Sequence, residues 1–289
     1  MSENPIVAGT DGSATAKLAM DRAAELAKAL GAPVHVVCVP SELQASEWPA
    51  RISAQQIVTE ASDRLRSQGV EVQTHLPKVL QGEAALALAA VAEQEHAQML
   101  VVGNKGMTGI RRLLGSLPNR VSHQARCDVL IVPTQSRSLA EFSGRSIVVC
   151  TDGSSGATRT LNEGIRLSKA LGGELHIVPL SQPPEATESA LAEAAAKAAN
   201  EGVEVVTHPL GGDPAGALFE VADKHDPAVI VVGSKGMHAG EREWFGSIAD
   251  KISHKGTSSV LIVFAGGVSG HEDEAMSGVE GSSGEDASP

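Results

Sequence analysis

The sequence has few cysteines, no excess of positive charge and no long apolar run, and each absence excludes a class of protein. Its three cysteines, Cys38, Cys127 and Cys150, include no pair at C-x-x-C spacing. This sparse set predicts reduced, buried thiols in a cytoplasmic protein, and no metal-binding pattern is visible. No apolar run reaches the roughly 18 residues of a membrane helix, and the polar start at residues 1–5 is not that of a signal peptide.

The excess of acidic over basic residues limits the kinds of partner that the protein can bind. The 289 residues include 23 Lys and Arg against 35 Asp and Glu, a formal net charge of −12. Non-specific nucleic-acid binding needs a basic surface, so the balance argues against a nucleic-acid partner. A bound nucleotide stays possible, because a local site can be positive on an acidic protein. Residues 266–289 are rich in Gly, Ser and acids, with no Lys or Arg, and they are expected to form a disordered tail.

Familiar catalytic motifs are also missing. The chain has neither a G-x-x-x-x-G-K-[ST] phosphate loop nor a G-x-S-x-G elbow. No nucleophile and base stand in a supporting context, so we expect no enzyme activity and assign no catalytic or metal-binding residue. Histidines instead occur in matching places in the two halves, which we interpret as duplication, with the strand histidines as core or rim residues. The pairs are His35 and His176, His75 and His208, and His123 and His254.

What the sequence does contain is an internal repeat. The segment IVAGTDGS at 6–13 recurs as IVVCTDGS at 147–154, and VLIV at 129–132 recurs at 260–263. KALG and GVEV segments recur between them in the same order. The chain is therefore predicted to hold one domain twice. The boundaries are 1–134 for domain 1, 135–146 for a linker, 147–265 for domain 2 and 266–289 for the tail.

Within each half, short apolar strands alternate with helices. In the first half, strands are expected at 6–10, 34–39, 70–75, 99–102 and 128–132, and helices at about 15–30, 52–68, 83–96 and 117–124. Strands that are apolar throughout and alternate with helices indicate a parallel sheet covered on both faces. In such sheets, ligands bind beyond the carboxyl ends of the strands, where the strand order reverses.

A glycine-rich stretch follows the fourth strand of each half. Gly103–Gly106 leads to Gly115–Ser116, and Gly233–Gly236 leads to Gly246–Ser247. Two glycines three apart allow a sharp turn that brings backbone N–H groups close to a ligand. The helix start that follows attracts phosphate through its unpaired N–H groups and its dipole. We interpret the two stretches as phosphate cradles; the alternative is a plain connection between strand and helix.

An aspartate ends the first strand of each half, at Asp11 and at Asp152. A carboxylate in this place can accept hydrogen bonds from ribose hydroxyls or from the adenine edge, although helix caps and turns also use aspartate. If the first strand neighbours the fourth, each aspartate and its glycine loop border one crevice. Ser116 and Ser247 suit phosphate oxygens, a role compatible with that of a helix N-cap.

These residues together resemble the signature of the universal stress protein family. That signature is an Asp after the first strand, then G-x-x-G after the fourth, nine residues and G-[ST]. The second half has the nine residues, 237–245, whereas the first half has eight, 107–114. The resemblance covers almost the whole chain outside the linker and tail. It implies an α/β fold of two tandem doubly wound domains, each a five-stranded parallel sheet of order 3-2-1-4-5 flanked by helices. It also implies that the two domains pair within the chain through their fifth strands, with a homodimer possible.

The resemblance further implies ATP as the ligand, with or without Mg²⁺; AMP or a cyclic nucleotide is not excluded. The implied function is a cytoplasmic, non-catalytic, nucleotide-dependent regulator of the stress response. A scaffold with degenerate sites and a weak ATP-hydrolysing enzyme are the alternatives, although neither an H-x-G-H nor an S-G-G-x-D-S stretch is present. The implied nucleotide-binding residues are Asp11, Gly103, Gly106, Gly115 and Ser116 in the first half, and Asp152, Gly233, Gly236, Gly246 and Ser247 in the second.

Overall fold

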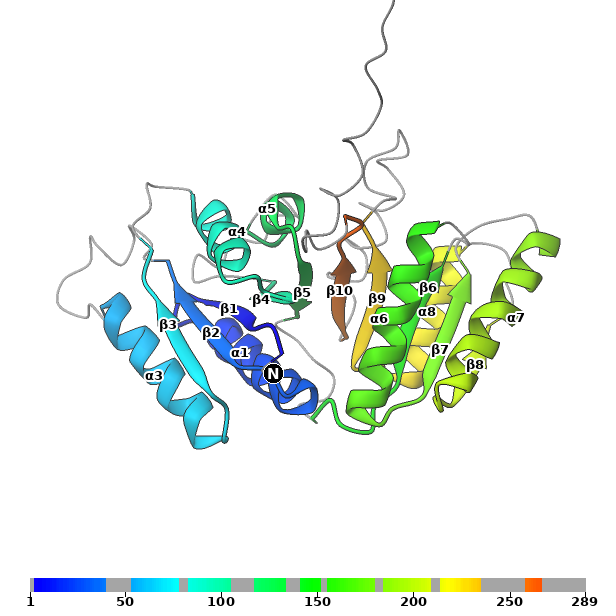
Figure 1. Cartoon of the computed structure of the whole chain (residues 1–289), viewed down its shortest axis with the longest axis horizontal. Coiled ribbons are helices and arrows are strands. Elements are labelled where there is room, and N and C mark those ends of the chain that lie inside the picture. Colours follow the sequence, from blue (N-terminus) through cyan, green and yellow to red (C-terminus); the bar gives the residue numbers. More distant parts are fainter. Residues whose placement is uncertain are drawn as a thin grey trace, which may run out of the picture.

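The strands of both repeats join into one ten-stranded sheet. The structure, a computed structural model, describes residues 3–39, 53–77, 83–104, 117–133, 141–151, 155–179, 184–208, 214–234 and 258–266. The strand order is β3-β2-β1-β4-β5-β10-β9-β6-β7-β8. Figure 1 shows the first repeat beside the second, with β5 and β10 adjacent at the centre. Each half-sheet is parallel and has the predicted order 3-2-1-4-5.

The first repeat alternates strands and helices as its sequence predicts. Its strands are β1 (Ile6–Thr10), β2 (Val34–Cys38), β3 (Val72–His75), β4 (Met99–Gly103) and β5 (Asp128–Val132). Its described helices are α1 (Ala14–Leu30), α3 (Ala54–Ser67), α4 (Ala84–Gln94) and α5 (Leu117–Gln124). The bounds of β1, α5 and β5 agree with the prediction, and those of the other elements differ by one or two residues.

The second repeat follows the same plan. Its strands are β6 (Ile147–Thr151), β7 (Leu175–Pro179), β8 (Val205–Thr207), β9 (Val229–Gly233) and β10 (Ser259–Val263). Its described helices are α6 (Ser155–Leu171), α7 (Pro184–Asn200) and α8 (Pro214–His225). None of the helices in the described part of the chain combines the length and apolar character needed to cross a bilayer.

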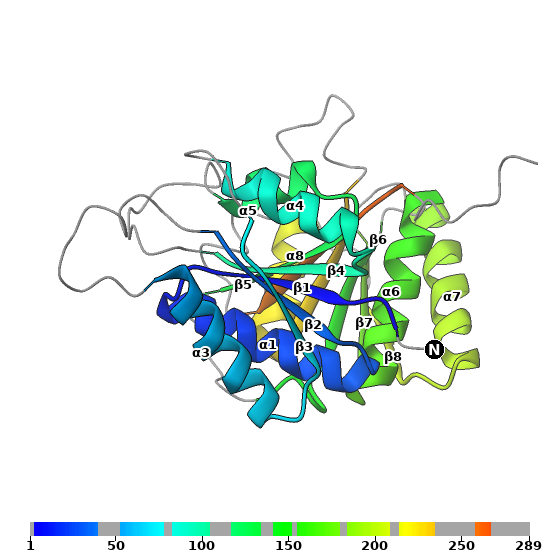
Figure 2. The ribbon, with the colours of Figure 1, turned by 60° about the vertical axis from the view of Figure 1, so that its left-hand side comes forward.

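Helices cover both faces of the sheet, and each face has its own core. Helices α1, α3, α6 and α7 pack on one face, where Met20, Leu65 and Ile165 are among the largest buried side chains. Helices α4, α5 and α8 cover the other face, around Leu100, Val121 and Leu218. Figure 2 shows α1 and α3 across the first half-sheet from α4 and α5. The doubly wound arrangement therefore matches the prediction.

Local signals in the sequence explain where elements begin and end. The Ser13 hydroxyl accepts a hydrogen bond from the Ala16 N–H, 3.2 Å, and caps α1. Gly31 ends the helix with a φ of 67°, the left-handed conformation of a glycine helix cap. Strand β3 begins later than expected, because the Val70 N–H bonds back to the Leu65 carbonyl, 3.2 Å, in the turn that closes α3.

The segment before β6 is more than a polar connection. Phe142 is 2% exposed, and its N–H donates to Oε2 of Glu25 on α1 at 2.7 Å. The Arg22 guanidinium lies 4.7 Å from the centre of the Phe142 ring. Phe142 therefore packs on the first repeat, while the segment that contains it leads into the second. The rest of the predicted linker, residues 135–140, lies outside the described residues.

Candidate functional site

The carboxyl edge of the first half-sheet brings the β1 and β4 ends together. Strand β1 pairs in parallel with β4 from Ile6–Met99 to Ala8–Val101, and with β2 on its other side. Chain connections leave β1 and β4 in opposite directions, so the strand order reverses between them. This is the crevice in which open α/β sheets bind ligands. The structure thus places Asp11 and Gly103 at neighbouring strand ends, as expected.

Asp11 lies in a tight turn between β1 and α1. Its Oδ1 accepts a hydrogen bond from the Ser13 N–H at 3.0 Å, and the Thr10 hydroxyl accepts one from the Gly12 N–H at 3.2 Å. Gly12 has a φ of 80°, a conformation that side chains with a Cβ rarely adopt. These bonds orient the Asp11 carboxylate at the edge of the sheet and direct the chain into the N-terminus of α1.

The Asp11 carboxylate also influences the neighbouring strand end. Burial, and after it the charge of Asp11, raises the pKa of the Cys38 thiol to about 11. Cys38 therefore stays a protonated thiol at neutral pH, and it is not a nucleophile there. The same reasoning holds for Cys127 and Cys150, since burial raises each of their pKa values to about 12.

Gly103 is a glycine for a reason that the sequence did not reveal. A Cβ at this position would lie 2.8 Å from Cγ2 of Thr15 and 3.3 Å from the Thr15 carbonyl. The end of β4 thus packs directly against the first turn of α1. In the second repeat, a Cβ on Gly233 would lie 2.9 Å from the Thr160 hydroxyl on α6. Close helix–strand packing accounts for both glycines, whether or not a ligand binds.

The glycine loops start alike in the two repeats. The Asn104 N–H donates to the Val132 carbonyl at 2.8 Å, and the Ser234 N–H donates to the Val263 carbonyl at 2.9 Å. Each loop is therefore attached to its fifth strand before it leaves the sheet. Of the ten predicted nucleotide-binding residues, seven lie outside the described residues: Gly106, Gly115, Ser116, Asp152, Gly236, Gly246 and Ser247.

A pocket beside the Asp11 turn was not predicted from the sequence. Its volume is about 170 Å³, and Thr10 and Gly12 border it together with residues of α1 and α3. Met20 and Ile57 contribute apolar surface, and Arg64 lies at the rim, where it forms a two-bond ion pair with Asp21 at 2.6 and 2.7 Å. Ligand pockets usually measure about 300–1,000 Å³, so this one admits only part of a nucleotide. Because α1 and α3 meet here through the fold, no local sequence signal identifies it.

Comparison with known proteins agrees with this architecture. The sequence profile described as the Universal stress protein family matches residues 4–133 and 144–263. A universal stress protein of Mycolicibacterium smegmatis is 25% identical over 292 residues, covering 91% of this chain and 97% of that protein. A shorter universal stress protein of Mycobacterium tuberculosis is 36% identical over 145 residues, covering 45% of this chain and 95% of its own length.

Solved structures show the same fold over nearly the whole chain. A universal stress protein from Archaeoglobus fulgidus has a TM-score of 0.70 at 19% identity, covering 92% of this chain and 98% of its own. A universal stress protein solved in complex with cAMP is 33% identical, with a TM-score of 0.38, and covers 47% of this chain and 100% of its own. The two profile matches, the repeated motifs and the paired half-sheets lead to one conclusion. The chain belongs to the universal stress protein family, as a member with two domains in tandem.

Proposed function

We propose that this protein is a nucleotide-dependent regulator of the stress response that binds ATP at the carboxyl edge of its half-sheets. The observation that supports this most directly is the juxtaposition of the Asp11 turn and the start of the Gly103 loop. They stand at the ends of β1 and β4, where the strand order reverses. A nucleotide in this crevice would meet a carboxylate on one side and backbone N–H groups on the other.

Each part of the edge suits a part of the nucleotide. The Asp11 carboxylate, oriented by the Ser13 N–H, would accept hydrogen bonds from the ribose hydroxyls or the adenine edge. The glycine loop after Gly103 would approach the phosphates, and the helix start near Ser116 would stabilise their charge through its dipole. Mg²⁺ would offset the remaining charge of the triphosphate. Asp152 and the loop after Gly233 would do the same in the second repeat.

We further propose that the nucleotide acts as a ligand and not as a substrate. The carboxyl edge, in the part that the structure describes, offers no nucleophile beside a base, and the Cys38 thiol is held protonated. Bound nucleotide would stabilise one state of the protein; at 100 times its dissociation constant it adds about 2.7 kcal/mol. The pairing of β5 with β10 would hold the two domains together as one unit within the chain. The proposed location of the protein is the cytoplasm.

A calorimetric titration of the full chain with Mg·ATP tests the binding site. Two equivalents are expected for the wild type, one for Asp11→Ala, one for Asp152→Ala and none for the double variant. Asp63→Ala, at a side chain that is 68% exposed on α3, is the matched control and should bind like the wild type. One equivalent in the wild type that survives Asp11→Ala would place the only working site in the second repeat.

Separate titrations test which nucleotide the site prefers. AMP and cAMP are titrated beside ATP, with and without Mg²⁺, because a 33% identical universal stress protein has been solved with cAMP. No heat and no rise in Tm with any of these ligands would reject the nucleotide site and favour a scaffold. ATP turnover above background that is lost in the Asp152→Ala variant would overturn the non-catalytic role.

A further inference from the structure

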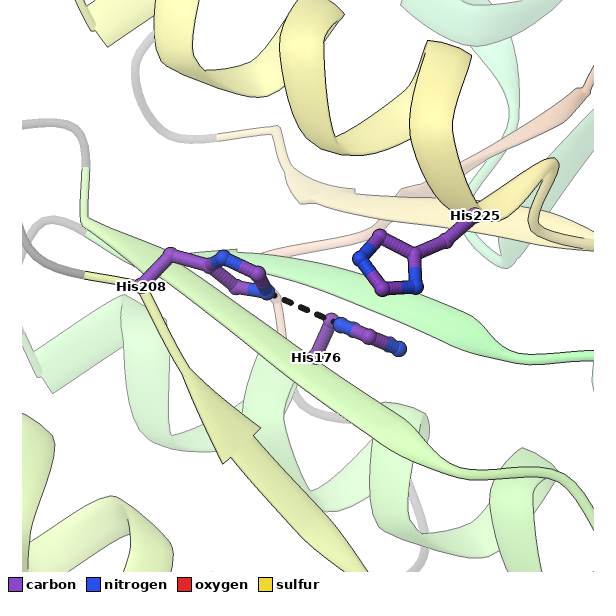
Figure 3. Close-up of side chains that lie close together, drawn as sticks. All are labelled: His176, His208 and His225. Carbon is purple, nitrogen blue, oxygen red and sulfur yellow. Dashed lines mark hydrogen bonds between the residues drawn. The ribbon is translucent and has the colours of Figure 1, made fainter.

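Three imidazoles from distant parts of the second repeat meet on the face of the sheet covered by α8. His176 is on β7, His208 directly follows β8 and His225 is the last residue of α8. Figure 3 shows the three rings side by side, with the hydrogen bond between His176 and His208 drawn as a dashed line. One ligand atom from each ring lies within 4.8 Å of the other two.

The contacts within this cluster leave nitrogen atoms for a ligand. Nδ1 of His176 lies 2.8 Å from Nε2 of His208, and the His176 and His225 ring centres are 4.2 Å apart. His176 is fully buried, and Nε2 of His225 is buried without a hydrogen-bond partner. An unpaired buried polar atom is costly, so its presence calls for an explanation.

The first repeat builds a similar cluster from the same elements. His35 on β2, His75 at the end of β3 and Glu95 just after α4 also bring ligand atoms within 4.8 Å of one another. Nδ1 of His35 lies 3.2 Å from Nε2 of His75 and 3.4 Å from Oε2 of Glu95. Glu95 corresponds to His225, because the next residue in each repeat, His96 or Asp226, has a positive φ. The two repeats therefore hold corresponding clusters that differ in one member, Glu95 in the first and His225 in the second.

We propose that each cluster binds one divalent transition-metal ion of the zinc class: His176, His208 and His225 in the second repeat, and His35, His75 and Glu95 in the first. Three imidazoles, or two imidazoles and a carboxylate, are ligand sets that hold Zn²⁺ while water fills the fourth position. Bonds of about 2.0–2.1 Å in a tetrahedron place ligand atoms about 3.3 Å apart. In the first cluster, the distances from Nδ1 of His35 to its two neighbours, 3.2 and 3.4 Å, are already close to this value. In the second, the ion would replace the His176–His208 hydrogen bond and separate those rings slightly.

The surroundings of the second cluster suit a bound metal ion. Oε2 of Glu174 lies 3.0 Å from Nε2 of His176, the ring nitrogen that faces away from His208, although not at a hydrogen-bond angle. A carboxylate in this place orients a metal-binding imidazole. All three cysteines are buried thiols that do not compete for the ion.

Zinc titration of the untagged, metal-stripped full chain tests the proposal. The wild type is expected to bind two Zn²⁺ ions. His225→Ala should lower the affinity of one site by at least about 100-fold, and Glu95→Ala should do the same at the other site. This loss equals or exceeds the largest typical effect of removing a residue that only supports a metal ligand. His123→Ala and Glu93→Ala, on α5 and α4 outside the clusters, are the matched controls and should keep both ions.

A second readout does not depend on any variant. Co²⁺ added to the wild type should develop the visible absorption of a tetrahedral site, and Zn²⁺ should abolish it. If His225→Ala fails to fold by circular dichroism, His208→Gln at the edge of the sheet replaces it. No binding to the wild type, or unchanged binding in both variants, overturns the proposal. One ion lost through only one of the substitutions supports the site in that repeat and overturns it in the other.

Discussion

At the scale of single residues, the glycines at the ends of β4 and β9 are needed for helix–strand packing, in addition to any role that they have in ligand binding. The glycine pattern predicted a turn that approaches phosphate, and the structure shows that Gly103 approaches Thr15 and Gly233 approaches Thr160. Both contacts join the end of a fourth strand to the helix that follows the first strand. A substitution at either glycine is therefore expected to change the free energy of unfolding even without ligand. Nucleotide-binding data on such variants need a stability measurement as a control.

Gly103→Ala is expected to destabilise the protein by about 1–2 kcal/mol. Overpacking of this kind typically costs about 1–3 kcal/mol, and part of this cost is offset because alanine lowers the conformational entropy of the unfolded chain. Thr15→Ser removes the methyl group nearest to the new Cβ and should recover part of the loss in the double variant. The measurement is urea unfolding without nucleotide. Additive effects of the two substitutions, within about 0.5 kcal/mol, would contradict the packing role.

At the scale of elements, the segment that enters β6 joins the two repeats. Phe142 packs on α1, and the Gly144 N–H donates to the Leu171 carbonyl at the end of α6 at 2.7 Å. Arg145 donates to the Asp226 carbonyl at 2.8 Å and forms an ion pair with its carboxylate at 3.0 Å. A Cβ on Gly173 would lie 1.9 Å from the Arg145 carbonyl oxygen. This segment is thus built into the contact between the repeats.

Phe142→Ala should lower the free energy of unfolding by about 3 kcal/mol or more, the usual cost of removing a buried aromatic ring. The substitution also leaves Arg22 without the ring that lies against its guanidinium. Leu86→Ala is the control, because Leu86 is 51% exposed and such changes stay within about 0.5 kcal/mol. Chemical unfolding of both variants measures the two changes in the free energy of unfolding. Equal changes would show that Phe142 is not part of the core.

At the scale of the whole molecule, β5 and β10 make the two half-sheets continuous. They pair antiparallel around Leu130 and Leu261. Asp128 of the first repeat accepts hydrogen bonds from the Phe264 N–H at 2.9 Å and from Arg159 at 3.1 Å. Both donors belong to the second repeat. Burial raises the pKa of Asp128 to about 6, and the nearby Glu163 adds to the rise.

The raised pKa of Asp128 predicts a pH-dependent contact between the repeats. A carboxyl group with a folded pKa above its unfolded value contributes most stability below the unfolded pKa, here 3.8, and this contribution is lost as pH rises through about 6. The stability of the wild type relative to Asp128→Asn should therefore fall by up to about 3 kcal/mol between pH 4 and 7, since one pKa unit corresponds to about 1.4 kcal/mol.

Urea unfolding of both proteins at the two pH values measures this difference. Asparagine does not titrate, and its Oδ1 can still accept the Phe264 N–H, so the comparison isolates the proton on Asp128. A difference that stays constant or grows with pH would show that the Arg159 charge, and not burial, controls this carboxyl group.

Much of the fold followed from local patterns in the sequence. Strands that are apolar throughout and alternate with helices, in two copies, predicted a doubly wound domain twice over, and the structure confirms it. The Asp11 turn was predictable because it immediately follows a strand, and the carboxyl ends of parallel strands share one edge. These features depend on neighbours in the chain, or on a periodicity that every residue of an element repeats.

Only the tertiary structure decided which distant side chains meet. Phe142 packs on Arg22, Asp128 bonds to Arg159, and three histidines separated by many residues converge beneath α8. The sequence showed His176 and His208 as duplicated positions but not as neighbours, and it gave no indication of His225, whose counterpart in the first repeat is Glu95. Such contacts depend on the order and register of strands and on the angle of each covering helix, which are set by packing of the whole sheet. The sequence by itself determined the elements and the repeat, and long-range packing determined the contacts between them, because no local pattern specifies which distant side chain will fill a given space.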